Sequence, residues 1–214
     1  MKKNTLFIVL IISIAVVIGF WRDNQDPQLA AQKFTLNNAL STGTMVPNPQ
    51  PLPQIELIDM FEKPFTNHYF NQHWTFLFFG YSSCPGICPL TLDAMHQISQ
   101  RLHAGNQVQF VFISIDPDHD TPARLKQYLQ QPRFKGTPFL GVTGKKPHIE
   151  ELAYTLGIHI AQSKDSHSEP IEHSGTILLV NPEGNLAAIF TSSEKPHAIA
   201  HDFKQVVHRY AQAS

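Results

Sequence analysis

Only two cysteines, Cys84 and Cys88, occur among the 214 residues, and no run of Lys or Arg is longer than a pair. Charged residues make up 15% of the chain and nearly cancel, which leaves a net charge of -1. A nucleic-acid-binding protein needs a basic excess that this chain lacks, so we exclude that class. No internal repeat is visible, and any thiol chemistry rests on the one pair of cysteines.

The chain does contain enough apolar sequence to build a core. Hydrophobic residues account for 42% of it. At this length we expect one globular domain of ordinary size, with some additional sequence outside it. The additional sequence lies towards the N-terminus.

An almost uninterrupted apolar run extends from Leu6 to Trp21, after two lysines. As a helix it would be roughly 24 Å long, at the short end of what crosses a bilayer core. We therefore expect a transmembrane anchor at residues 4–21, with residues 1–3 in the cytoplasm. A cleaved signal peptide is the alternative, but no small-x-small cleavage site follows the run. The anchor predicts a single-pass protein of the bacterial inner membrane, with its domain facing the periplasm or the cell exterior.

Residues 22–52 are rich in Asn, Gln, Asp and Pro and end in "VPNPQPL". Such a composition buries little surface and predicts a tether. The patch "AAQKFTLNNAL" within it could pack on the domain or form a turn of helix. We place the folded domain at residues 53–214.

Strand and helix patterns alternate along this domain. Continuous apolar runs predict buried strands, and apolar residues at helical spacing predict helices. The order is typical of an α/β domain with a thioredoxin-like fold. The expected strands are two short ones in 54–66, then 74–81, 108–116 and 138–144, and two around a turn in 175–191; the expected helices are 89–103, 121–131, 145–157 and 196–211.

In this order Cys84 falls in the loop after a buried strand, and Cys88 falls at the start of the following helix. A helix start favours thiolate over thiol, and the thiolate is both nucleophile and metal ligand. Two thiolates separated by three residues suit a soft ion such as Cu(I). A thiol catalyst and a structural disulfide are the alternatives. Outside the cytoplasm the pair would be oxidised to a disulfide unless a metal or a reductant prevented it.

A third metal ligand has to come from the twelve histidines. Most of them occupy polar positions of helices or first turns, where a solvent-facing role is the ordinary one. His173 differs, because it directly precedes a buried strand that in this fold lies near the cysteine loop. His167, in the polar segment before it, is the rival.

Three sequence blocks resemble the Sco/SenC family of membrane-tethered copper proteins. They are "FFGYSSCPGICPLTL", "ISIDPDHDTPARLKQYL" and "EHSGTILLVNPEGNL". The resemblance implies a thioredoxin-like fold, copper bound by Cys84, Cys88 and His173, and delivery of copper to the copper A site of cytochrome c oxidase. Two features depart from the family: Gly86 stands where many members have an acidic residue, and "HIAQSKDSHSEPIE" replaces the usual aromatic-rich segment.

The motif "DPDHDTP" alternates Asp116, Asp118 and Asp120 like the start of a calcium loop. It lacks the glycine and the bidentate Glu that such a loop requires, so we interpret it as a loop followed by a helix cap at Asp120 or Thr121. In the resembled family this loop lies beside the site, where Asp116 would orient the cysteine loop or a partner.

Three functions fit this sequence. The first is a copper chaperone whose partners are the copper A subunit of cytochrome c oxidase and an upstream periplasmic copper donor. The second is a thiol-disulfide reductase, in which Cys84 attacks and Cys88 resolves, served by a periplasmic thiol reductant. The third is a copper-dependent redox sensor.

Overall fold

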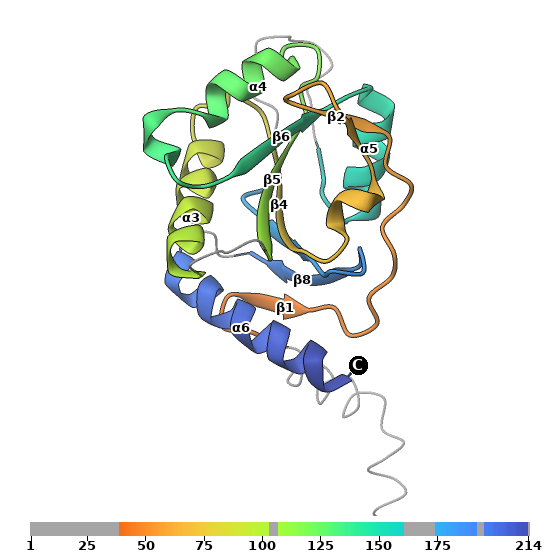
Figure 1. Cartoon of the computed structure of the whole chain (residues 1–214), viewed down its shortest axis with the longest axis vertical. Coiled ribbons are helices and arrows are strands. Elements are labelled where there is room, and N and C mark those ends of the chain that lie inside the picture. Colours follow the sequence, from red (N-terminus) through yellow and green to blue (C-terminus); the bar gives the residue numbers. More distant parts are fainter. Residues whose placement is uncertain (1–38, 103–106, 161–173, 192–194, 214) are drawn as a thin grey trace, which may run out of the picture. The chain divides into compact units, whose positions relative to one another are not determined.

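The computed structural model describes residues 39–102, 107–160, 174–191 and 195–213 (Figure 1). Within these residues, eight strands form one sheet with the order β1-β8-β7-β4-β5-β6-β2-β3. The central strands β4, β5 and β6 are parallel, and the pairs toward both edges are antiparallel. The strands are β1 (Gly43–Met45), β2 (Leu57–Asp59), β3 (Pro64–Phe65), β4 (Trp74–Gly80), β5 (Val108–Ser114), β6 (Phe139–Thr143), β7 (Ile177–Val180) and β8 (Leu186–Phe190).

Helices connect the parallel strands and cover the sheet. Figure 1 places α3 and α5 on opposite sides of β4 and β5. The α-helices are α3 (Ile87–Leu102), α4 (Pro122–Leu129), α5 (Lys146–Thr155) and α6 (Pro196–Ala213); two 3-10 helices, η1 (Asn67–Phe70) and η2 (Pro132–Phe134), lie in connections. This mixed α/β arrangement confirms the predicted strand and helix order.

Phenylalanines fill the middle of the core. Phe76 of β4 stacks on Phe110 of β5 with ring centroids 5.3 Å apart, and it also contacts Phe203 of α6. Every residue of β4 after Trp74 is buried. This burial on both faces is the physical reason for the continuous apolar run in the sequence, and it fixes the end of β4 that carries the cysteine loop.

The folded unit begins earlier than the boundary at residue 53 that composition indicates. Its compact part starts at Leu40, and β1 pairs with β8 at the edge of the sheet. Asp202 of α6 is fully buried and accepts hydrogen bonds from Thr42 N–H at 2.8 Å and from the hydroxyls of Ser41 and Thr42. Residues 40–52 of the expected tether are thus part of the domain, because a distant strand and a buried carboxylate supply their hydrogen bonds.

The start of α4 distinguishes between the two predicted capping residues. Thr121 is the N-cap, and its hydroxyl accepts a hydrogen bond from Arg124 N–H. The Asp120 side chain does not cap α4; it accepts hydrogen bonds from Ser82 and Ser114 beside the cysteine loop. Gly157 has a φ of 71°, which explains how the chain leaves α5 at that glycine.

In the part of the chain that the structure describes, none of the helices has the length and apolarity to cross a membrane. The predicted anchor at residues 4–21 and most of the predicted tether lie outside the described residues.

Candidate metal centre

The cysteine loop lies at the carboxyl end of β4 and leads directly into α3. Cys84 N–H donates to Tyr81 O at 3.2 Å, which closes a tight turn after the strand. Cys88, in the first turn of α3, donates its N–H to Cys84 Sγ at 3.4 Å. The sulfur of Cys84 therefore sits at the N-terminus of the helix, where the helix dipole favours negative charge. No disulfide bond joins the two cysteines.

Cys88 lies beneath Cys84 and packs against Gly80. Its side chain is fully buried, and its Sγ accepts a long hydrogen bond from Tyr81 N–H at 3.5 Å. A Cβ added to Gly80 would lie 2.8 Å from this sulfur and 2.9 Å from the Phe112 ring. Gly80 is thus required for the close approach of Cys88 to the strand, a role that sequence reasoning missed. A glycine that ends an apolar strand just before a cysteine motif was the available signal.

The two thiols differ in their electrostatic surroundings. Burial raises the pKa of the Cys88 thiol far above its ordinary range, and the neighbouring Cys84 and Asp120 raise it further, while the Tyr81 N–H acts in the opposite direction. The predicted helix-start stabilisation of thiolate is therefore wrong for Cys88, because desolvation outweighs it. Cys84 is only partly buried, which leaves its sulfur as the accessible one.

Asp120 joins the cysteine loop to the two elements beside it. Its buried carboxylate accepts from Ser82 N–H at 2.9 Å, from the Ser82 hydroxyl and from the Ser114 hydroxyl at 2.7 Å. Arg124 lies 3.7 Å away and also donates to the Ser82 hydroxyl. These contacts link the cysteine loop to the end of β5 and to α4.

Within the described residues, the Asp116 side chain does not contact the cysteine loop that it was expected to orient. The Asp116 carboxylate pairs with His119 at 2.9 Å, which raises the pKa of that exposed imidazole. Asp120, four residues later in the same motif, contacts the cysteine loop instead. The role of orienting the cysteine loop therefore falls to Asp120, and the alternative role of Asp116, contact with a partner, stays a prediction.

The surface around the cysteines is open and partly apolar. Pro85 and Gly86 are exposed, and Leu90 in the first turns of α3 is 65% exposed. No atom lies within 4 Å of a Cβ added at Gly86, so a larger residue fits there. This face is accessible to a partner that approaches Cys84.

Neither candidate histidine lies within the described residues: His173 and His167 fall in the segment 161–173. Among the histidines that are described, His96 pairs with Thr137, and His197 pairs with Arg101. No group of three or more His, Cys, Asp or Glu side chains in the described ranges could hold a metal ion. The described part of the chain thus brings together two sulfurs and leaves a third ligand to be proposed.

The strand register shows where the chain re-enters the sheet after this segment. Ile177, the first residue of β7, pairs with Phe78, two residues before Gly80. Because β7 is antiparallel to β4, the chain reaches β7 from the end of the sheet that carries the cysteine loop. Ser174, bonded directly to His173, is the first described residue of this approach.

This arrangement suits a soft metal ion or thiol chemistry. The two sulfurs are connected by the Cys88 N–H contact, one is partly exposed, and the other is shielded by apolar groups. Thiolate sulfur is the ligand type that selects Cu(I), and a dithiol of this kind also undergoes exchange with disulfides.

Comparison with known proteins agrees with the sequence resemblance. A "Putative copper-binding protein" of Stutzerimonas stutzeri is 34% identical over 163 residues, which cover 75% of this chain and 78% of that protein. The crystal structure of yeast Sco1 with copper bound is 26% identical with a TM-score of 0.64, and the match covers 75% of this chain and 90% of that one. The solution structure of apo Sco1 from Thermus thermophilus is 28% identical with a TM-score of 0.64, over 77% and 95% of the two chains.

These likenesses confirm the predicted thioredoxin-like α/β fold and the predicted family. The model of the SCO1/SenC family matches residues 47–208, a span that includes β2, the cysteine loop and the region of His173. Because this match covers well over half of the chain, the protein belongs to the SCO1/SenC family.

Proposed function

We propose that this protein carries copper on Cys84, Cys88 and His173 and delivers it to the copper A site of cytochrome c oxidase. The observation that carries the proposal is the pair of neighbouring cysteine sulfurs at the carboxyl end of β4, one partly exposed and one buried. Yeast Sco1, which has the same fold, has a structure with copper bound. The Sco family is described, for BsSco, as one of cytochrome c oxidase assembly proteins.

The two sulfurs supply a site for Cu(I). Metal ligation requires thiolates, so copper uptake releases the thiol protons. The buried Cys88 keeps its proton in the metal-free protein, and copper takes the place of that proton. The apolar wall of Gly80 and Phe112 behind Cys88 keeps water away from this side of the ion.

His173 is the proposed third ligand. The strand register supports it, because Ser174 to Thr176 lead into β7 beside the end of β4. A nitrogen ligand adds affinity for Cu(II), which prefers imidazole and oxygen donors, whereas two thiolates hold Cu(I). Three ligands of this kind fit a carrier that binds both oxidation states.

Delivery requires that thiolates of the acceptor reach the copper. Cys84 is the exposed sulfur, and the open surface at Pro85, Gly86 and Leu90 gives an acceptor subunit a place to dock. The acceptor thiolates would replace Cys84 first and Cys88 last, because Cys88 is the shielded ligand. An upstream periplasmic donor would load copper by the same exchange in reverse.

The proposed location is the bacterial inner membrane. Residues 4–21 anchor the chain, residues 1–3 stay in the cytoplasm, and the tether that follows leads to the domain, which starts near Leu40 and faces the periplasm or the cell exterior. The apolar run and the two lysines before it support this orientation. A protein released from membranes by alkaline extraction would contradict the anchor.

Copper stoichiometry of the purified protein tests the site. Wild type should bind one Cu(I) or Cu(II), and His173→Ala should lose the charge-transfer absorption of Cu(II) while it retains most Cu(I) binding. Cys84→Ser and Cys88→Ser should lose both. Copper binding that survives in both cysteine variants would exclude this site.

A thiol-disulfide reductase is the second candidate, and the accessible Cys84 above the shielded Cys88 favours it. The Cys84 thiolate would attack an acceptor disulfide, and Cys88 would then attack the mixed disulfide. The acceptor leaves with two thiols, the Cys84–Cys88 pair becomes a disulfide, and a periplasmic reductant restores it. This reaction does not use His173, so full support of oxidase assembly by His173→Ala at low copper would favour the reductase over the chaperone.

A further inference from the structure

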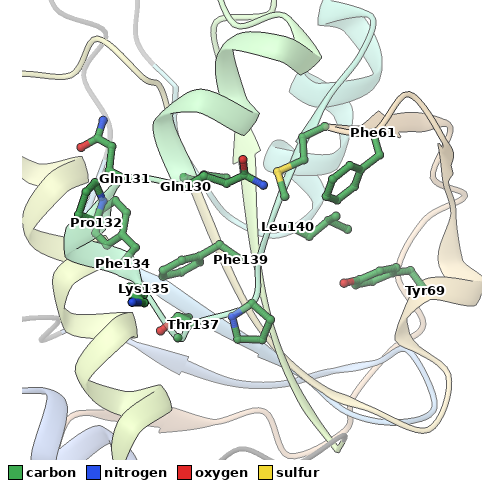
Figure 2. Close-up of a pocket in the computed structure, with 14 residues that line it drawn as sticks. Phe61, Tyr69, Gln130, Gln131, Pro132, Phe134, Lys135, Thr137, Phe139 and Leu140 are labelled. Atoms are coloured by element: carbon green, nitrogen blue, oxygen red, sulfur yellow. The ribbon is translucent and has the colours of Figure 1, made fainter.

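A second concave surface lies away from the cysteine loop. It is a groove of about 800 Å³, lined on one side by η2 and on the other by Phe61 and Tyr69, with Phe139 and Leu140 of β6 between them (Figure 2). In the register of the parallel strands, Phe139 is level with Phe76, four residues before Gly80. The groove is therefore displaced by roughly 13 Å along the strands from the end of β4.

Strand β6 lines part of this groove and is only partly paired with its neighbour β2. β2 pairs with β6 at Val142 and Thr143, and the ladder ends where Met60 N–H donates to Gly141 O. Phe139 and Leu140 lie beyond this register and line the groove. A strand edge that β2 leaves uncovered at Phe139 and Leu140 suits an extended peptide segment.

Positively charged side chains lie beside the groove, in addition to the acidic Asp59 and Glu62 that flank its residues Met60 and Phe61. The stretch from Pro122 to Pro138 contains four Lys or Arg residues and no Asp or Glu, although the chain as a whole has a net charge of -1. Lys126 Nζ lies 5.2 Å from the centroid of the Phe61 ring, and the Arg133 guanidinium lies 4.4 Å from that of Phe134. Lys135 lines the groove itself. These contacts hold cations beside the aromatic walls.

None of these three cations has an ion-pair partner within the described residues. Other cations of the domain do lie within ion-pair distance of a carboxylate, among them His119, Arg124 and His201. Lys126, Arg133 and Lys135 are exposed and therefore available to carboxylates of another molecule.

Tyr69 adds a hydrogen-bond donor. Figure 2 shows its hydroxyl directed toward Leu140 and the middle of the groove. Burial and the nearby Asp59 carboxylate raise the pKa of Tyr69 to about 12, so the hydroxyl keeps its proton. A protonated phenol can donate to a carboxylate or to a peptide carbonyl.

We propose that this groove docks an extended, acidic segment of a partner protein whose alternate side chains are apolar. The apolar side chains would contact Phe134, Phe139 and Leu140, and the carboxylates would face Lys126, Arg133 and Lys135. A membrane surface fits less well, because Phe139 and Leu140 are only 5% and 8% exposed at the bottom of a concavity that a bilayer does not enter. The site goes beyond the proposed copper function and leaves the cysteine loop accessible while it is occupied.

Fluorescence anisotropy with the full-length protein in neutral phosphatidylcholine nanodiscs tests the proposal. The probe is a fluorescein-labelled nine-residue peptide that alternates Asp and Leu. It should bind saturably, whereas peptides that alternate Lys with Leu or Asp with Ser should bind at least tenfold more weakly. The triple variant Lys126→Glu/Arg133→Glu/Lys135→Glu should lose at least tenfold in affinity, and Tyr69→Phe about threefold.

The matched control is Lys145→Glu/Lys195→Glu/Lys204→Glu, which makes the same charge change at exposed lysines outside the groove. It should bind the peptide within twofold of wild type. Equal losses in the two triple variants, or equal binding of the Lys-Leu peptide, would overturn the proposal. The proposal would also be overturned if the three groove cations are required for binding to phosphatidylserine vesicles but not for binding to the peptide. Copper stoichiometry should be the same in all variants, which separates this test from that of the copper site.

Discussion

Asp120 is the residue on which the position of the cysteine loop most depends. Its carboxylate is 1% exposed and holds Ser82 and Ser114, which belong to different elements. Asp120→Asn removes the charge that Arg124 faces and turns one acceptor into a donor beside two other donors. We expect this variant to lose about 2–4 kcal/mol of unfolding free energy, measured by urea denaturation.

Asp118→Asn is the control, because Asp118 belongs to the same motif and is exposed. It should change the unfolding free energy by less than about 0.5 kcal/mol. Equal effects of the two substitutions would mean that general loop charge, and not the Asp120 contacts, accounts for the loss.

The buried Cys88 thiol makes stability depend on pH. Its pKa in the folded protein is raised by burial above the value of about 8.5 of an exposed cysteine. Below that value both folded and unfolded chains keep the proton, so the contribution of Cys88 is fully present. As pH rises above it, the unfolded chain releases the proton and the folded chain does not, so stability falls by up to about 1.4 kcal/mol per pH unit.

Urea midpoints of the reduced, metal-free protein at pH 8 and pH 10 measure this loss. Cys88→Ala should reduce the difference between the two pH values, because it removes the group that titrates. The same decrease in wild type and Cys88→Ala would assign it to other groups, among them the half-buried Tyr69 and Tyr128, whose pKa values are both raised to about 12.

At the scale of elements, the junction of β4 and α3 depends on a glycine. Gly80→Ala places a Cβ within 2.8 Å of Cys88 Sγ and within 3.0 Å of the Phe78 ring, so the start of α3 or the strand must shift. We expect a loss of about 1–3 kcal/mol in unfolding free energy and weaker Cu(I) binding in competition with a chelator. Gly86→Ala, at an open position six residues later, should change neither by a measurable amount. Tight Cu(I) binding by a destabilised Gly80→Ala would show that the sulfur pair tolerates this shift.

How far the elements could be predicted depends on where their partners lie in the sequence. The strand at residues 74–81 was predictable, because burial on both faces leaves a continuous apolar run. β1 was not, because its three residues gain their stability from β8 and from Asp202, which lies 160 residues away from Thr42. Local composition therefore described this segment as a tether.

The same reason applies to the site. The cysteine pair and its place between a strand and a helix follow from local sequence, and the structure bears out this placement. The role of Asp120 does not follow from local sequence, because its partner Ser82 lies 38 residues away. The three alternating aspartates of the motif also give no sign of which one contacts the loop. The buried state of Cys88 depends on packing against Gly80 and Phe112, which a helix-start argument does not include.

At the scale of the whole molecule, the structure predicts where the folded domain begins. A chain that starts at Leu40 retains β1 and the donors of Asp202, whereas a chain that starts at Pro53 loses them together with the buried Met45 and Leu52. Burial of the two side chains contributes on the order of 4 kcal/mol. Loss of the Ser41 and Thr42 donors leaves the Asp202 carboxylate buried without these partners, which adds to the cost.

We therefore expect the 40–214 chain to unfold cooperatively, and the 53–214 chain to be less stable by at least about 4 kcal/mol, a large part of the 5–15 kcal/mol typical of a domain. Thermal and urea unfolding of the two soluble chains measure the difference. Asp202→Ala in the 40–214 chain removes the carboxylate but keeps β1, so it should lie between them. If the two truncations are equally stable, the segment from Leu40 to Leu52 is a peripheral strand that the domain does not need, and the boundary at residue 53 indicated by composition is the functional one.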